Sequence, residues 1–164
     1  MAKINSKKKG NRGELECVKL LTEKLGEGFA RVPSSGAWGG GKNRELRENM
    51  SYEQKLTLVA DIMAPPDFNF VLEHKFYEEA SFWDLFNESS NLNEWIKQVS
   101  SDAAFVEKAP MLIVKYNRHK RIVFIEEKYE SLREDKNPVF TWKGWSCYNF
   151  ETLLDREEEF WFNE

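Results

Sequence analysis

Apolar side chains recur at the spacing of an α-helix in two parts of this chain. The first part predicts an amphipathic helix over residues 11–25 that ends at Gly26. Its inward-facing side chains are expected to be Leu15, Val18, Leu21 and Leu25. The second part predicts a helix over residues 92–107. Its inward-facing side chains are expected to be Leu92, Trp95, Ile96, Val99 and Ala103.

Short apolar runs bounded by turn residues predict the strands. They cover residues 29–32, 56–63, 70–76, 111–116 and 121–125, and a short strand and a terminal helix are expected within residues 141–162. Residues 33–42 are rich in Gly and Ser and predict a loop, whereas residues 43–55 are compatible with either a helix or an excursion. The order of elements predicts an α/β fold in which a central mixed β-sheet is flanked by helices.

Length and composition predict one domain with a substantial core, because 41% of the 164 residues are hydrophobic and 32% are charged. We expect residues 1–9 to form a flexible basic arm and residues 10–164 to form that domain. No apolar run approaches the roughly 20 residues of a membrane helix, and the first residues lack the apolar core of a secretory signal. We therefore expect a cytoplasmic protein, without a membrane partner, in which Cys17 and Cys147 are free thiols.

The net charge of −4 conceals an uneven distribution along the chain. Residues 1–50 carry 11 Lys/Arg against 6 Asp/Glu (+5), residues 51–125 carry 8 against 11 (−3), and residues 126–164 carry 5 against 11 (−6). A basic first third on an acidic body favours a protein with one nucleic-acid-binding face. Charge asymmetry is also common without that function, so it is weak evidence by itself.

Two carboxylates and one ammonium are predicted to meet on the hairpin formed by the second and third strands. Asp61 and Glu73 are equidistant from the centre of its turn and should lie opposite each other. Glu73 and Lys75 share a face because alternate strand residues do, and His74 points the other way. Carboxylates this close favour a divalent cation, and hard oxygen ligands select Mg²⁺, or alternatively Mn²⁺, over zinc. Lys75 would hold a water nucleophile or stabilise developing negative charge.

Asp67 is the competing candidate, because it spells the sequence P-D-x5-E-x-K with the residues that follow. It sits at the turn, six residues from Glu73, which is about 20 Å along a strand. We therefore expect Asp61, and not Asp67, to be the metal ligand. The structural alternative is a surface hairpin with an ordinary cross-strand Glu–Lys pair.

Glu14 lies in the first predicted helix, where a carboxylate also has a purely structural explanation as a complement to the helix macrodipole. A cluster of cations lies just before Glu14 in the sequence. We expect this cluster to bind DNA phosphates through counterion release. The members of this cluster are Lys7, Lys8, Lys9 and Arg12. The alternative for the cluster is a solubilising tail.

The loop after the first strand offers a guanidinium, hydroxyls and free backbone amides. Arg31, Ser34 and Ser35 supply the side chains, and this combination suits phosphate oxygens. We expect these residues to contact DNA. An ordinary Ser/Gly loop is the alternative.

Four motifs, in this order, resemble those of the PD-(D/E)XK nuclease superfamily. They are Lys9-Gly10-x-x-x-Glu14, Arg31-x-Pro33-x-Ser35-Gly36, Ala60-Asp61-Ile62 and Glu73-His74-Lys75. The first two are similar to motifs of archaeal-type and phage Holliday junction resolvases, and the resemblance is closest to phage members. It implies a restriction-endonuclease-like core and a homodimer that binds branched DNA in the host cytoplasm.

The same resemblance implies the role of each site residue. Glu14, Asp61 and Glu73 would hold the metal, and all three would be catalytic. Lys75 would be the catalytic lysine, Ser35 would contact the scissile region, and Gln98 would be a polar active-site residue on the following helix.

Three functions are compatible with these residues. The first is a structure-selective, Mg²⁺-dependent endonuclease that resolves four-way (Holliday) junctions. The second is a restriction- or repair-type endonuclease that cuts duplex or flap DNA with the same core. The third is a DNA-binding module without catalysis, which the intact set of Glu14, Asp61, Glu73 and Lys75 argues against.

Overall fold

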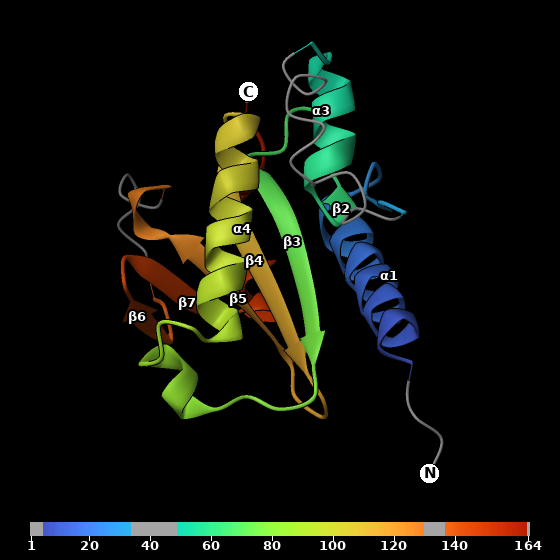
Figure 1. Cartoon of the computed structure of the whole chain (residues 1–164). Coiled ribbons are helices and arrows are strands. Elements are labelled where there is room, and N and C mark those ends of the chain that lie inside the picture. Colours follow the sequence, from blue (N-terminus) through green and yellow to red (C-terminus); the bar gives the residue numbers. More distant parts are fainter. Residues whose placement is uncertain (1–4, 34–48, 130–136, 164) are drawn as a thin grey trace.

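A mixed β-sheet forms the centre of the protein (Figure 1). The computed structural model describes residues 5–33, 49–129 and 137–163. Over these residues the sheet has seven strands in the order β1-β2-β3-β4-β5-β7-β6, and only β3 and β4 pair in parallel. The strands are β1 (Ala30–Arg31), β2 (Ile62–Met63), β3 (Phe70–Tyr77), β4 (Ala109–Tyr116), β5 (Arg121–Glu126), β6 (Phe140–Trp142) and β7 (Trp145–Asn149). The predicted α/β class is confirmed.

Helices cover both faces of this sheet. The described helices are α1 (Ser6–Leu25), α3 (Tyr52–Val59), α4 (Asn91–Phe105), α5 (Phe150–Leu153) and α6 (Glu158–Trp161), with 3₁₀ turns η2 (Phe82–Leu85) and η3 (Glu127–Tyr129). Figure 1 shows α4 crossing one face, where Trp95 and Val99 pack on Leu112 of β4. Helices α1, α5 and α6 enclose the main core on the other face. None of the described helices combines the length and apolarity needed to cross a membrane.

Helix α1 begins earlier than the sequence pattern predicts. The side chain of Asn5 accepts hydrogen bonds from the backbone N–H groups of Lys7 and Lys8, which caps a helix starting at Ser6. The expectation of a flexible arm over residues 1–9 is therefore wrong for residues 6–9, and residues 1–4 lie outside the described part. The predicted end is confirmed, since Gly26 follows the last turn with a φ of 98°.

The inner face of α1 also differs from the prediction. Its buried residues are Gly13, Cys17 and Leu21, whereas Leu15 is 57% exposed. Residues two positions apart do not share a helix face, so a helix that turns Gly13 and Cys17 inward must turn Leu15 outward. The small glycine determines this choice because it lets α1 approach the sheet closely.

The predicted strand over residues 56–63 is wrong in its first half. Residues 52–59 form α3, which begins with a capping box in which Ser51 and Gln54 exchange backbone-to-side-chain hydrogen bonds. Only Ile62–Met63 remain as strand, yet the predicted register holds. Ile62 pairs with Leu72, which sets Asp61 opposite Glu73.

The remaining predictions agree with the structure except at the C-terminus. The helix over 92–107 and the hairpin of 111–116 with 121–125 are confirmed as α4, β4 and β5. The last segment forms the β6–β7 hairpin and two short helices instead of one strand and one helix. Trp161 is fully buried and stacks on Phe68 at 5.9 Å, so the terminal aromatic residues build core. Cys17 and Cys147 are buried free thiols.

Candidate active site

The backbone of β3 holds the Asp61 carboxylate just before β2 begins. The N–H of Asp61 donates to the carbonyl of Leu72 at 3.1 Å, and its Oδ2 accepts from the N–H of His74 at 3.0 Å. Asp61 is only 8% exposed. The carbonyl of Asp61 accepts from the N–H of Val32 at 2.9 Å, so its backbone is paired on both sides, while its side chain lines a cleft that a ligand can enter.

Glu73 and Lys75 project together from β3 toward α4. The Nζ of Lys75 lies 2.5 Å from Oε1 of Glu73 and donates to Oε1 of Gln98 at 3.3 Å. The structure thus brings Gln98, a residue implied by family resemblance alone, into contact with the proposed catalytic lysine. Glu73 is 1% exposed, so its charge needs such partners.

Glu14 reaches the same region from α1. Its Oε2 accepts a hydrogen bond from Nε of Arg31 at 2.5 Å, and Arg31 also donates to Asn11 at 2.7 Å. Burial raises the pKa of Glu14, and the nearby Asp61 carboxylate raises it further. Glu14 lies more than two turns after Ser6, beyond the first turn in which the macrodipole acts. The structural explanation of Glu14 as a helix-start carboxylate therefore fails.

Glu73 is the most deeply buried of the three carboxylates, and its pKa shows the effect. Burial, with the Asp61 carboxylate adding to it and Lys75 opposing both, raises the pKa of Glu73 to about 8. Asp102 of α4 also raises this pKa, although the sequence reasoning did not single it out. It lies four residues after Gln98, hence on the same face of the helix, and that spacing was the signal available.

The donor set fits a hard divalent cation. Asp61 and Glu73 would hold it, and Glu14 would join them on leaving Arg31, since carboxylate oxygens suit Mg²⁺ or Mn²⁺. Among the described residues no three such side chains already form a closed metal cluster. When bound, the cation would polarise a phosphodiester and lower the pKa of a coordinated water.

A cleft of about 660 Å³ opens beside these residues. Lys7 and Lys9 of α1 line it together with Glu14, Asp61 and Lys75. The cleft, which Glu78 and Glu79 also line, therefore combines lysines that can contact phosphates with carboxylates that can hold a cation.

The other predicted DNA-binding residues occupy different surroundings. Lys8 is exposed and not part of the cleft lining, and Arg12 forms an exposed ion pair with Glu16 at 3.6 Å. Arg31 is held by Glu14. Ser34 and Ser35, with the Gly36 of the same motif, lie outside the described residues.

Asp67 lies away from this cleft. It lines a separate acidic hollow with Glu158 and Glu159 near the C-terminus. Its backbone carbonyl accepts from the N–H of Asn163 at 2.9 Å. The structure supports the choice of Asp61 over Asp67.

Gly13 and His74 fix the distance between α1 and β3, which the sequence reasoning missed. A Cβ on Gly13 would lie 2.8 Å from Cδ1 of Phe76 and 2.9 Å from Cε1 of His74. Burial and Arg121 lower the pKa of His74 to about 3, so the ring is neutral. Arg121 also donates to the carbonyl of Gly13 at 3.3 Å. These contacts, which we call the clamp, hold Gly13, the residue before Glu14, against the strand that carries Glu73 and Lys75.

The mixed sheet with an aspartate at the start of β2, a buried E-x-K strand and a carboxylate from the first helix defines a PD-(D/E)XK-type nuclease. Residues 5–159 match the family described as "Phage putative PDDEXK endonuclease", and the chain belongs to that family. Nucleases of this kind typically use divalent metal ions.

One curated relative extends this finding. The chain is similar to Protein D14 of Escherichia phage T5, with 30% identity over 129 residues, which cover 75% of this chain and 72% of that protein. No solved structure was found to match the chain. Both the family and this relative come from phages, as the sequence resemblance suggested.

The clamp between α1 and β3 predicts opposite effects for two glycines of one helix. Gly13→Ala should destabilise the protein by about 1–3 kcal/mol through overpacking. Gly10→Ala should stabilise it by up to about 1 kcal/mol, because a Cβ there meets no atom within 4 Å. Chemical denaturation of each variant measures both changes. Gly13→Ala with His74→Ala should cost less than the sum of the single variants, and strict additivity would contradict the clamp.

The raised pKa of Glu73 predicts that metal affinity depends on pH. A proton on Glu73 competes with the cation, so the affinity for Mn²⁺ should rise up to about tenfold per pH unit from pH 6 and level off near pH 8. Isothermal titration calorimetry measures this dependence. Glu73→Gln should bind more weakly and lose the slope. A wild-type affinity that is constant from pH 6 to 8 would show that Glu73 does not take part.

Proposed function

We propose that this protein is a structure-selective endonuclease that resolves four-way DNA junctions by Mg²⁺-dependent phosphodiester hydrolysis. The observation that carries the nuclease part is the register that sets Asp61 beside Glu73, with Asp61 and Lys75 lining one cleft. The junction specificity is supported by the order of the motifs around Glu14 and Arg31, which resembles that of Holliday junction resolvases.

The side chains around the cleft have two proposed roles, which are to position the reacting groups and to balance their charge. Lys75 is oriented by Glu73 and Gln98 and can hold the attacking water or stabilise negative charge on the phosphate. The ammonium of Lys9 lies over the ring of Phe76 at 4.5 Å. It is buried and donates no hydrogen bond to any described residue, so a backbone phosphate that enters the cleft would supply the acceptor that it lacks.

Junction resolution requires a cut in each of two opposing strands. One chain carries a single set of Glu14, Asp61, Glu73 and Lys75, so two copies are needed for a paired cut. We therefore propose a homodimer as the active form. Magnesium is the proposed ion, because it is the hard divalent cation that phosphate chemistry commonly employs.

Three DNA substrates test this function. With Mg²⁺, the protein should introduce paired, symmetric nicks into a labelled immobile four-way junction and should cut a linear duplex of the same sequence far more slowly. A flap substrate is the third arm. Equal cutting of the linear duplex would contradict junction resolution and indicate a restriction-type nuclease. A preference for the flap would indicate a repair-type nuclease.

Two aspartates provide the control for this experiment. Asp61→Asn should abolish cleavage, a loss of at least about a hundredfold, while junction binding persists. Asp67→Asn should cut at the wild-type rate, because Asp67 lies in the acidic hollow near the C-terminus. The reverse result would show that the catalytic carboxylate has been misassigned.

A further inference from the structure

Arg31 forms an ion pair with Glu14, the carboxylate that α1 contributes to the cleft. Its Nε donates to Oε2 of Glu14 at 2.5 Å, and its Nη2 donates to Oδ1 of Asn11 at 2.7 Å. The side chains of Arg31 and Glu14 are only 22% and 14% exposed. If one partner left a shielded pair of this kind, the other would remain as a poorly solvated charge. Arg31 and Glu14 therefore separate readily only when each finds a new partner.

The backbone around this ion pair is fixed. Arg31 pairs with Ile62, the residue after Asp61, and Val32 donates its N–H to the carbonyl of Asp61 at 2.9 Å. Glu14 lies on α1, which the clamp holds against β3. A change of partners therefore requires only side-chain rotations, which are fast compared with movements of the backbone.

The carboxylates of the site outnumber its cations by one. The carboxylates are Glu14, Asp61 and Glu73, and the cations are Arg31 and Lys75. Burial and repulsion from Asp61 raise the pKa of Glu14, and Arg31 opposes both effects. A bound divalent cation would reverse the balance and leave one positive charge in excess. One of the two protein cations would then be available to an anion.

Arg31 is better suited than Lys75 to bind a DNA phosphate. A guanidinium presents several donors in one plane and can bind two phosphate oxygens, whereas an ammonium is a point charge. Asn11 holds Nη2 of Arg31, and its contact does not depend on Glu14. Asn11 lies four residues after Lys7 and three before Glu14, so the three side chains share a face of α1. Lys7 lines the cleft, so a DNA strand that follows this face passes from Lys7 to Arg31.

We infer that Arg31 passes from Glu14 to a DNA phosphate when the site takes up its divalent cation. Glu14 turns to the cation, and Arg31, still held by Asn11, donates to the phosphate. Each ligand thereby raises the affinity for the other, because the exchange gives a carboxylate to the cation and a donor to the phosphate. This inference rests on the proposed DNA endonuclease function and adds a coupling between its two ligands.

The affinity of the DNA-free protein for Mn²⁺ is the first test. Arg31→Gln keeps a hydrogen-bond donor beside Glu14 but removes the charge that competes with the cation. At pH 8 the variant should therefore bind Mn²⁺ about tenfold more tightly than the wild-type protein in isothermal titration calorimetry. A merely structural Arg31 predicts weaker binding, because its loss would disorder the site. An unchanged or weaker affinity would overturn the inference.

DNA binding with and without a divalent cation is the second test. The probes are a four-way junction and a linear duplex, in Ca²⁺ or in EDTA, and a denaturing gel verifies that the DNA stays intact. Ca²⁺ also takes carboxylate oxygens as ligands, so it should strengthen binding to the wild-type protein. In Arg31→Gln this gain should be about tenfold smaller, with little change in EDTA. Equal gains in the two proteins would contradict the exchange.

A pair of variants keeps the inference testable if Arg31→Gln fails to fold. In EDTA, Glu14→Gln should strengthen DNA binding, because it releases Arg31 and also removes a negative charge. Glu14→Gln with Arg31→Gln leaves neither charge unpaired and retains only the effect of the lost carboxylate. The double variant should therefore bind DNA about tenfold more weakly than Glu14→Gln. Equal affinities of these two variants would overturn the inference.

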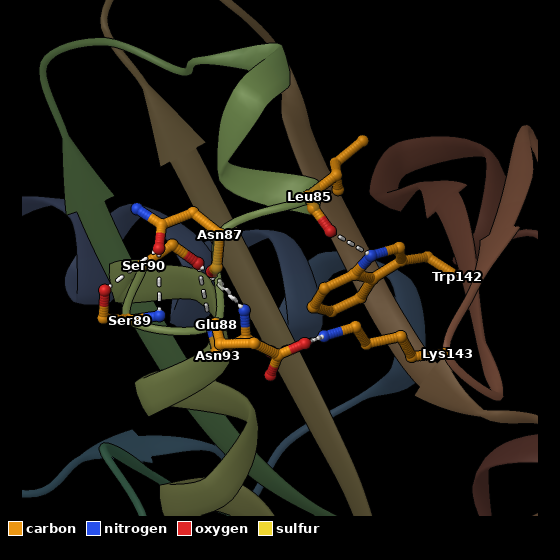
Figure 2. Close-up of polar contacts among 8 residues, drawn as sticks. All are labelled: Leu85, Asn87, Glu88, Ser89, Ser90, Asn93, Trp142 and Lys143. Carbon is orange, nitrogen blue, oxygen red and sulfur yellow. Dashed lines mark hydrogen bonds and ion pairs between the residues drawn. The ribbon is translucent and has the colours of Figure 1, made fainter.

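Lys143→Gln is a matched control, because it also removes a cation from an ion pair. Figure 2 shows the pair that Lys143 forms with Glu88. Lys143 lies between β6 and β7, at the opposite edge of the sheet from β1, which carries Arg31. Its variant should keep the wild-type affinity for Mn²⁺ and the wild-type gain in Ca²⁺. A loss of this gain as large as that in Arg31→Gln would show that the coupling does not belong to Arg31.

These outcomes are separate from those of the proposed function. If the wild-type protein fails to cut junctions but Arg31→Gln binds Mn²⁺ more tightly and loses the gain in Ca²⁺, junction resolution falls and the exchange stands. If the wild-type protein cuts junctions and Arg31→Gln shows neither change, the inference falls alone.

Discussion

The structure depends on one short stretch of antiparallel pairing, between Ile62 and Leu72. That register lets Asp61 donate to the carbonyl of Leu72 and accept from the N–H of His74. Hydrogen bonds to two backbone groups of β3 thus fix Asp61, which is 8% exposed, just before β2 begins. Since β3 is held by its pairing with β4, a slip of one residue between β2 and β3 would turn Asp61 to the other face of the sheet and separate it from Glu73.

Charge balance connects this register to the rest of the fold. Three carboxylates converge from α1, the start of β2 and β3, and their burial, together with repulsion from Asp61, raises the pKa values of Glu14 and Glu73. Arg31 and Lys75 offset part of this repulsion in the structure. A divalent cation would offset the rest of the repulsion. A group of buried carboxylates that is unfavourable by itself thereby becomes a binding site for a cation. The tight packing at Gly13 brings α1 close to the sheet, and this places the Glu14 carboxylate near Asp61.

Sequence reasoning predicted the class of fold, helix α4, the β4–β5 hairpin and the register at Asp61. The pairing of Asp61 with Glu73 could be predicted although residues 52–59 form a helix and not a strand. Which residues face each other across a hairpin depends only on the centre of its turn, and not on how long the strands are. Leu15 was assigned to the wrong face because α1 carries two overlapping apolar stripes, and only the contact of Gly13 with His74 selects between them. The exposure of Phe82, Trp83 and Phe86 was equally hidden, since composition does not distinguish a surface ring from a core ring.

The position of bound Mn²⁺, located by anomalous X-ray scattering from a crystal grown with the ion, tests the role of Asp61 most directly. The register predicts a single strong peak bounded by carboxylate oxygens of both Asp61 and Glu73. A peak confined to the acidic hollow of Asp67, Glu158 and Glu159, with none between Asp61 and Glu73, would contradict it.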